Sequence, residues 1–196
     1  NGAGKTTTLK IITGLLKPTS GEVTIFDKPL SDVSIREKIG FLPEHPSYYN
    51  HLTGFEVLDF AGGLFGISTK EKKKRIEHLL DMVGLVNAQN TRVSDYSKGM
   101  VQRLGIAQAL VNNPELVIFD EPLSGLDPIG RKEIKDIILS LKEDGKTVFF
   151  STHILADVER LCDRVGILHK GKLLKIGTLS ELLIDRKRKV NITFAF

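Results

Sequence analysis

The sequence predicts an α/β fold in which helices flank a mostly parallel sheet and an α-helical subdomain is inserted. Two apolar runs, Leu116–Phe119 and Thr147–Phe150, have the length and composition of buried strands. Segments with helical periodicity separate the strand candidates, and strands that alternate with helices favour a parallel sheet. The chain has 196 residues, of which 41% are hydrophobic, so it is long enough to bury one sizeable core.

The first half of the chain divides at turn residues and at changes of periodicity. Apolar residues recur at helical spacing over residues 6–16, where a Lys-Pro-Thr-Ser-Gly run ends the predicted helix. Residues 23–26 and Ile39–Leu42 are short strand candidates. The pattern over residues 53–112 is mostly helical, and we expect it to form the inserted subdomain. Within it, a capping box is predicted at Ser68 and Glu71.

The second half continues the alternation of helices and strands. Apolar residues over 134–141 predict an amphipathic helix between the two apolar strands. Residues 164–168 and 173–176 flank Lys170-Gly171 and predict a hairpin. A short helix is expected at 179–184. A basic run over 186–189 then leads into a strand at 190–196, which we interpret as the start of an extension.

The chain opens on a glycine-rich stretch that matches the end of the P-loop pattern G-x-x-x-x-G-K-[ST]. Glycines let backbone N–H groups turn inward around phosphate oxygens, and the following helix directs its positive end at the same anion. We expect Lys5 to reach the β- and γ-phosphates of a nucleotide and the Thr6 hydroxyl to bind Mg²⁺. A plain glycine-rich turn before a helix is the alternative. The predicted nucleotide-binding residues are Asn1, Gly2, Ala3, Gly4, Lys5, Thr6 and Thr7.

Two acidic residues, Asp120 and Glu121, directly follow the apolar run Leu116–Phe119. This is the Walker B pattern, and the carboxyl end of a parallel strand is where such sheets bind ligands. We expect Asp120 to hold Mg²⁺ and Glu121 to orient or deprotonate an attacking water. Two acids that end a loop are the alternative, which the P-loop upstream disfavours.

Three further motifs carry a resemblance to a known family. Residues 96–100, Tyr-Ser-Lys-Gly-Met, resemble the signature motif of ATP-binding cassette (ABC) ATPases, and residues 124–127, Ser-Gly-Leu-Asp, resemble their D-loop. His153 resembles the switch histidine. With the P-loop and Walker B, these motifs stand in the order of that family. The resemblance implies a P-loop NTPase fold for residues 1–196, as one domain that lacks its first strands.

The resemblance also implies a mechanism with ATP and Mg²⁺ as cofactors. Two cassettes pair head to tail, so each ATP lies between one P-loop and the other subunit's signature. Ser97 and Gly99 would bind the γ-phosphate across this interface, with Lys98 in the same cofactor-binding set. His153 would contact the γ-phosphate and hold the transition state, and Asp127 would link the two sites.

The sequence departs from the family pattern at three places. Lys98 and Met100 replace a glycine and a glutamine of the signature, a form that exporter-type cassettes include. Glu44 stands at the glutamine position of the Q-loop, where its carboxylate is an expected ligand of Mg²⁺ that adds negative charge beside the phosphates. The aromatic residue that stacks on adenine in this family would precede Asn1.

The function implied is an ATP-binding and ATP-hydrolysing subunit of an ABC transporter, in which dimer closure drives export through a separate membrane permease. A second cassette, identical or different, is the other expected partner, and no nucleic acid is expected. In the family, the segment 44–66 faces the permease, and Tyr48 and Tyr49 are predicted to be exposed in that contact.

Two other functions stay open at this point. A soluble ABC ATPase that acts on ribosomes or nucleic acid is the main alternative, and a nucleotide switch without hydrolysis is the third. Glu121 and His153 disfavour the switch, because both serve hydrolysis. No apolar run approaches the roughly 18 residues that span a bilayer, so we expect that this chain does not cross a membrane alone. The resemblance to transporter ATPases implies a peripheral protein at the cytoplasmic face of the cell membrane.

Overall fold

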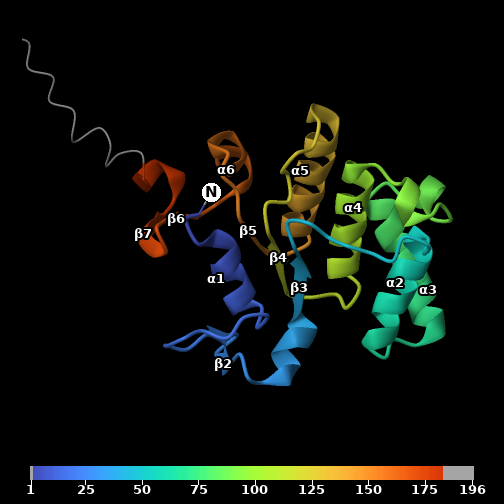
Figure 1. Ribbon diagram of the computed structural model, residues 1–196, viewed down its shortest axis with the longest axis horizontal. Coiled ribbons are helices and arrows are strands. Elements are labelled where there is room, and N and C mark those ends of the chain that lie inside the picture. Colours follow the sequence, from blue (N-terminus) through green and yellow to red (C-terminus); the bar gives the residue numbers. More distant parts are fainter. Residues whose placement is uncertain (1, 183–196) are drawn as a thin grey trace, which may run out of the picture. The chain divides into compact units, whose positions relative to one another are not determined.

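The computed structural model describes residues 2–182 and divides the chain into two compact units (Figure 1). The larger unit comprises residues 6–151, and the described part of the smaller one comprises residues 2–5 together with 152–182. Asn1, the basic run at 186–189, the predicted strand at 190–196 and the end of the predicted helix at 179–184 lie outside the described residues.

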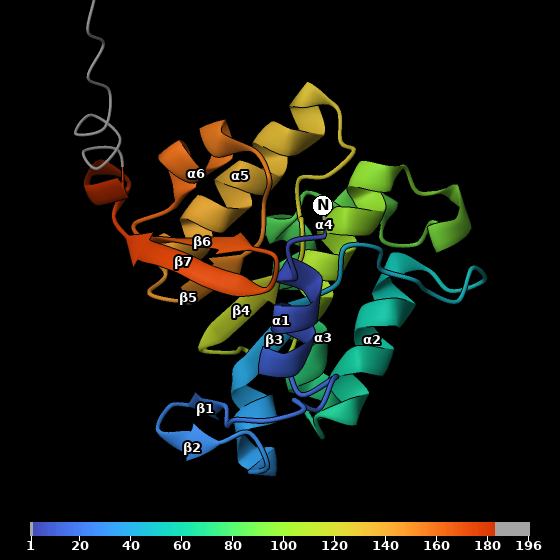
Figure 2. The ribbon, with the colours of Figure 1, turned by 60° about the vertical axis from the view of Figure 1, so that its left-hand side comes forward.

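A three-stranded parallel sheet forms the centre of the larger unit (Figure 2). Its order is β3 (Ile39–Leu42), β4 (Leu116–Phe119) and β5 (Thr147–Phe150), and each strand occupies a segment predicted as a strand. Val117, Ile118 and Phe119 of the central strand are completely buried. Leu42, Phe119 and Phe150 are register partners, so the carboxyl ends of all three strands lie at one edge.

Helix α5 (Pro128–Glu143) packs against β5 and confirms the helix predicted over 134–141. Its buried stripe consists of Ile134, Ile137, Ile138 and Leu141. Helix α1 (Lys5–Ile12) is shorter than the predicted 6–16. The Thr13 hydroxyl donates to the Leu9 carbonyl oxygen at 2.9 Å, and Gly14 turns to a positive φ of 75°, so the helix ends before Leu15.

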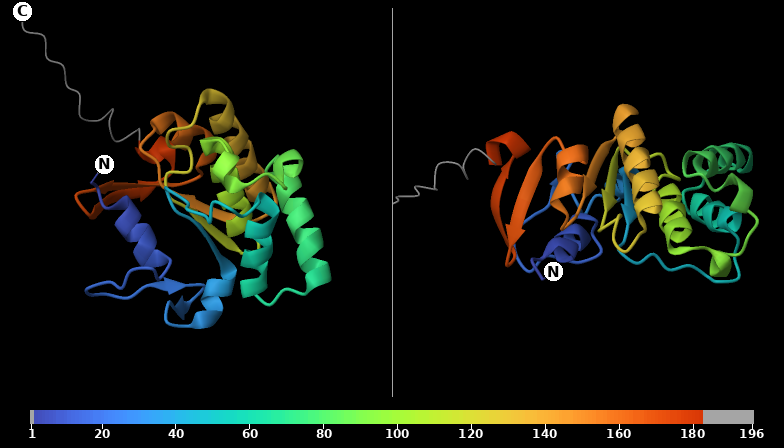
Figure 3. Two further views of the ribbon diagram at one scale, coloured as in Figure 1. Left: turned by 45° about the vertical axis from the view of Figure 1, so that its right-hand side comes forward. Right: turned by 90° about the horizontal axis from the view of Figure 1, so that it is seen from above.

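Three helices confirm the predicted helical stretch over 53–112 (Figure 3). They are α2 (Gly54–Leu64), α3 (Thr69–Met82) and α4 (Lys98–Ala109). The short 3₁₀ turns η2 (Val86–Ala88) and η3 (Val93–Asp95) lie between α3 and α4. Their shared core includes the buried Leu58, Ile76, Leu80 and Leu104. Helix α4 also packs on β3. Gly40 permits the close approach, because a β-carbon there would overlap the Ala109 carbonyl oxygen.

The capping box lies on a different helix from the predicted one. Ser68 accepts the Glu71 N–H at 3.4 Å, but the Glu71 carboxylate pairs with Arg75 at 2.7 Å. The reciprocal pair occurs at the start of α2, where the Glu56 carboxylate accepts the Thr53 N–H at 2.8 Å and the Thr53 hydroxyl accepts the Glu56 N–H at 3.2 Å. The serine–glutamate spacing alone did not show that a basic residue one turn later would compete for the glutamate.

A small antiparallel hairpin replaces the single strand predicted at 23–26. Strands β1 (Thr24–Ile25) and β2 (Lys28–Pro29) pair across a turn in which Phe26 and Asp27 have φ values of 52° and 58°. A 3₁₀ helix, η1 (Val33–Lys38), then leads into β3.

The smaller unit contains α6 (Leu155–Leu161) and the hairpin of β6 (Val165–His169) and β7 (Lys172–Gly177). Lys170 and Gly171 make the turn with positive φ values of 47° and 74°, which confirms the predicted hairpin. A helical turn then begins at residue 179. Among residues 2–182, no helix has the length and hydropathy that a membrane span requires.

Candidate functional site

The predicted Walker B residues lie at the carboxyl edge of the sheet. The Asp120 N–H donates to the Leu42 carbonyl oxygen at 2.9 Å, and the Ser151 N–H donates to the Phe119 carbonyl oxygen at 2.9 Å. The parallel hydrogen-bond ladder therefore continues one step past the strands. It brings Asp120 and Ser151 side by side, and Glu44 leaves the same edge two residues after β3.

Ser151 joins the two acidic residues of Walker B. Its hydroxyl donates to Asp120 Oδ1 at 2.7 Å and accepts the Glu121 N–H at 2.9 Å. Asp120 is 1% exposed, and Glu121 and Ser151 are each 7% exposed. The hydrogen bond to a buried carboxylate is charge-assisted and therefore among the stronger kinds. Sequence reasoning missed Ser151, although a hydroxyl residue directly after the neighbouring parallel strand was a usable signal.

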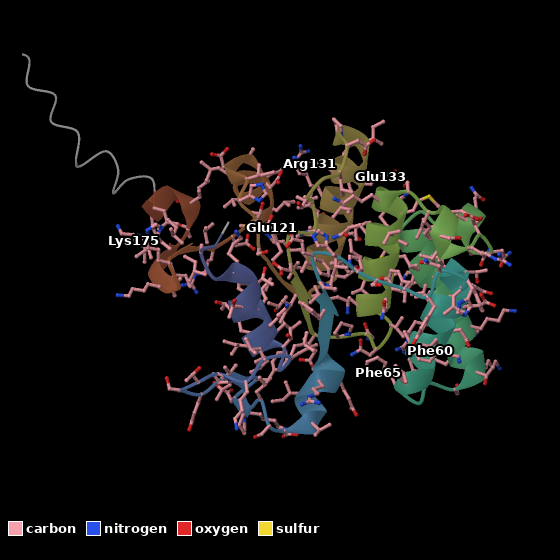
Figure 4. The ribbon with its side chains drawn as sticks, viewed as in Figure 1. Phe60, Phe65, Glu121, Arg131, Glu133 and Lys175 are labelled. Carbon is pink, nitrogen blue, oxygen red and sulfur yellow. The ribbon has the colours of Figure 1, made fainter. Side chains whose placement is uncertain are left out.

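Glu121, labelled in Figure 4, has an unusual backbone conformation. Its φ is 47°. Left-handed backbone is uncommon for residues other than glycine, and such conformations persist where the surroundings hold them. Two hydrogen bonds do so here, because Ser151 accepts the N–H of Glu121 and the Ser124 N–H donates to its carbonyl oxygen at 3.0 Å. These two hydrogen bonds fix the backbone of Glu121 and therefore the direction in which its side chain leaves the chain.

The residues predicted to bind Mg²⁺ suit that ion chemically. Mg²⁺ is a hard cation that takes one or two carboxylates together with phosphate oxygens and waters. Asp120 supplies a buried carboxylate, and Thr6 lies in the first turn of α1. Glu44 has a partly exposed side chain whose Oε1 lies 4.0 Å from His45 Nε2. Within residues 2–182 no group of three His, Cys, Asp or Glu side chains could hold a metal without added ligands.

The predicted phosphate loop shows the backbone conformations that its glycines permit. Gly2 and Gly4 have φ values of 78° and 97°. The Ala3 carbonyl oxygen accepts the Gly171 N–H at 2.8 Å. Helix α1 begins at Lys5, so the amide groups of its first turn point out of the helix end, as an anion site requires. Asn1, the first residue of the predicted set, lies outside the described residues.

His153 is exposed and lies in the smaller unit, two residues before α6. The hydroxyl of its neighbour Thr152 accepts the Ile154 N–H at 3.1 Å, which shapes the turn that carries the histidine.

The predicted signature residues occupy the start of α4. Ser97 is the N-cap, and its hydroxyl accepts the Met100 N–H at 3.3 Å. Tyr96 anchors this end, because its hydroxyl donates to the Ala88 carbonyl oxygen at 2.8 Å and burial raises the pKa of Tyr96. Gly54 of α2 approaches the same ring so closely that a β-carbon there would overlap the Tyr96 hydroxyl. The contacts with Ala88 and Gly54 thus hold Tyr96 in place at the start of α4.

Asp127 of the predicted D-loop caps α5. Its Oδ1 accepts the Gly130 N–H at 2.9 Å, and Pro128 occupies the first helical position, where its missing N–H is harmless. One carboxylate oxygen is therefore engaged within the subunit.

An apolar groove of about 400 Å³ lies where the segment after β3 meets α2 and α4. Its lining consists of Ser47, Tyr48, Tyr49, Leu52, Val57, Phe60 and Gln108. Of these, Phe60 is 60% exposed, and Leu64, further along α2, is 72% exposed. Figure 4 labels Phe60 and Phe65, which follows the last residue of α2. The prediction that Tyr48 and Tyr49 are both exposed is half wrong. Tyr49 is exposed, whereas Tyr48 is partly buried, and this burial raises the pKa of Tyr48.

Comparison with known proteins gives consistent matches. A family model described as ABC transporter matches residues 1–124. The chain is 51% identical to an uncharacterized ABC transporter ATP-binding protein of Synechocystis, over 93% of this chain and 52% of that protein. It is 46% identical to the bacitracin transport ATP-binding protein of Bacillus licheniformis, over 97% of this chain and 61% of that protein. The chain thus spans about half to three-fifths of the length of these curated relatives.

A solved structure matches as well. It is a dimeric ATP-binding cassette in a post-hydrolysis state, bound to ADP and Pi. The TM-score is 0.80 at 33% sequence identity, and the match covers 90% of this chain and 81% of that one. This likeness confirms the predicted α/β fold with a P-loop.

Proposed function

Because this chain belongs to the ABC transporter family of ATP-binding proteins, we propose that it binds and hydrolyses ATP as the energy-coupling subunit of a membrane exporter. The observation that carries the proposal is the buried hydrogen-bonded group of Asp120, Glu121 and Ser151 at the carboxyl edge of the sheet. The relatives named for transport support this reading over a soluble ATPase that acts on ribosomes or nucleic acid.

Each residue of this group has a separate task in the proposed reaction. Asp120 would hold Mg²⁺, which when bound neutralises charge on the phosphates. Ser151 keeps the Asp120 carboxylate oriented by donating to Oδ1, so the second oxygen is left to face the ion or its waters. Glu121 would accept a proton from the attacking water, and its strained, doubly hydrogen-bonded backbone fixes the direction of its side chain. Outside this group, His153 would contact the γ-phosphate.

The phosphates would be bound by residues 1–7 and, in a head-to-tail dimer, by the signature of a second cassette. Ser97, Lys98 and Gly99 form the exposed end of α4, where helix geometry favours an anion. The dimeric relative supports this arrangement. Asp127, near the same end, would contact the second site with the carboxylate oxygen that does not cap α5.

The apolar groove is the proposed docking site for a cytoplasmic segment of the permease. It presents the aromatic side chains Tyr49 and Phe60 on one surface, with Leu64 and Phe65 exposed nearby on or just after α2. Exposed apolar groups gathered at one place favour a protein partner over bare solvent. The chain would therefore lie peripherally at the cytoplasmic face of the cell membrane.

The test of the ATPase proposal is Glu121→Gln in the full chain. Loss of the proton acceptor should lower turnover about 100-fold or more, while ATP binding is retained and the dimer stalls closed. Turnover would be measured by phosphate release and the dimer by sedimentation with ATP and Mg²⁺. Glu143→Gln, at the far end of α5, is the matched control and should hydrolyse ATP like the parent. Unchanged turnover in Glu121→Gln would remove this residue from its proposed role.

A further inference from the structure

Lys98 lies against the D-loop of its own subunit. A β-carbon at Gly125 would overlap Lys98 Nζ and would lie 3.3 Å from its Cε and 3.9 Å from its Cδ. The end of the lysine side chain therefore runs along the Gly125 backbone. Lys98 is the first residue of α4, and Gly125 belongs to the turn between Walker B and α5, so the contact joins two separate elements.

The position of this ammonium group is electrostatically unusual. The N-terminus of a helix carries a positive partial charge, so a cation in the first turn is unfavourable by itself. The first turn of α4 contains no acidic residue to offset it. A lysine here strengthens the attraction of the helix end for an anion, and the contact with Gly125 keeps the ammonium beside the D-loop.

Gly125 suits this contact for two reasons. Its φ of 65° is a conformation that residues with a β-carbon rarely adopt, and its missing side chain leaves the space that the Lys98 ammonium fills. Any other residue at position 125 would push the ammonium away from the turn.

We propose that Lys98 is a positioning residue that couples the signature to the D-loop of the same subunit, so that both enter the partner's ATP site as one preformed unit. The proposal rests on the proposed function, since it requires that ATP closes a dimer. Two separate loops would each lose conformational freedom when the dimer closes. A preformed pair loses less, which favours closure.

A double-mutant cycle tests this coupling in the full chain that carries Glu121→Gln, where ATP-bound dimers accumulate. The dimer dissociation constant with ATP and Mg²⁺ would be measured by sedimentation for Lys98→Met, Gly125→Ala and the pair. Residues that act together give non-additive effects. We expect Lys98→Met to weaken dimerisation about tenfold, Gly125→Ala several-fold, and the pair no more than Lys98→Met alone. Lys98→Arg, which keeps the cation, should recover most of the loss.

Gly66→Ala is the matched control for backbone strain. Gly66 has a φ of 66°, almost that of Gly125, but a β-carbon there would meet nothing within 4 Å. Its substitution should leave dimerisation unchanged, and thermal unfolding would report any general loss of structure.

The proposal is overturned if the two effects simply add, or if Gly125→Ala behaves like Gly66→Ala. Either result would mean that Lys98 acts without the D-loop. A Glu121→Gln parent that stays monomeric with ATP would instead overturn the proposed function itself, and the coupling with it.

Discussion

The carboxyl edge of the sheet and the groove at α2 differ in which kinds of side chain they bury and expose. At the edge, the polar side chains of Asp120, Glu121 and Ser151 are buried and hydrogen-bonded to one another. At the groove, the apolar side chains of Tyr49 and Phe60 are exposed. Folding alone favours apolar side chains in the interior and polar side chains at the surface, and each of these regions shows the reverse. The difference teaches that the first arrangement suits a small charged ligand, whereas the second suits a protein partner.

After Glu121→Gln, the largest expected effect would come from breaking the polar edge at Ser151. Ser151→Ala leaves the Asp120 carboxylate without its hydroxyl donor and the Glu121 N–H without its acceptor. A buried polar group that loses its partner costs about 1–3 kcal/mol, so unfolding in urea should show a clear loss of stability. ATP turnover should fall at least about tenfold. A misplaced Glu121 raises the activation free energy of hydrolysis, and each 1.4 kcal/mol of that increase slows the reaction by about a factor of ten.

Ser94→Ala is the control for this change, since the Ser94 hydroxyl is exposed and donates to its neighbour Asp95 at 3.1 Å. It should leave both stability and turnover near the parent values. If Ser151→Ala behaved in the same way, the hydrogen bonds at the edge would have no role in holding Walker B.

A substitution in the groove should have the opposite pattern of effects from Ser151→Ala, with stability nearly unchanged and partner binding lost. Phe60→Asp places a charge on a side chain that is 60% exposed, so the free energy of unfolding should change by no more than about 0.5 kcal/mol. Binding to the permease should be lost, because an unpaired charge would be buried in the contact. Co-purification with the permease and ATPase activity of the isolated chain measure the two effects separately.

Val33→Asp provides the comparison, because Val33 is 67% exposed on η1. It should leave permease binding intact. Loss of binding in Val33→Asp, or intact binding in Phe60→Asp, would show that the groove is not the docking site.

The sequence predicted the polar edge far better than the groove, and the reason is physical. Asp120 and Glu121 are adjacent in the chain and follow a strand, so a local pattern reveals them. Ser151 joins them only through the pairing of β4 with β5, about 30 residues apart, and a single pattern does not contain that register. The groove draws Tyr48, Phe60 and Gln108 from three elements. Tyr48 was predicted to be exposed because nothing local shows that its hydroxyl would approach Gly105 of α4.

The helices and strands, too, were predicted well where a local pattern determines them and less well where it does not. The strands Ile39–Leu42, Leu116–Phe119 and Thr147–Phe150 were predicted with their observed bounds, because each is a short run rich in β-branched or aromatic residues that proline or polar residues bound on both sides. The helix after the P-loop was overextended to residue 16, since Leu15 and Leu16 fit the period although Gly14 ends the helix. Periodicity describes side chains, whereas a helix end depends on the backbone conformation of one residue.

The smallest expected effect concerns the helix that carries Phe60. Thr53→Ala removes the N-cap of α2, which should lower stability by about 1 kcal/mol. The Thr53 N–H holds the pKa of Glu56 below its usual range, so ionised Glu56 stabilises the folded state. That contribution is present above the unfolded-state pKa near 4.5 and is lost as the pH falls through the lower folded-state pKa.

Glu56→Gln should therefore flatten the acid side of the stability profile between about pH 5 and 3, with little change in its shape near pH 7. Chemical unfolding across this range measures the profile. An unchanged acid side would mean that the charge of Glu56 does not contribute to the stability of the folded state. Because glutamine can still accept the Thr53 N–H and the polar edge lies on other elements, permease binding and ATP turnover at neutral pH should both be the same in Glu56→Gln as in the parent.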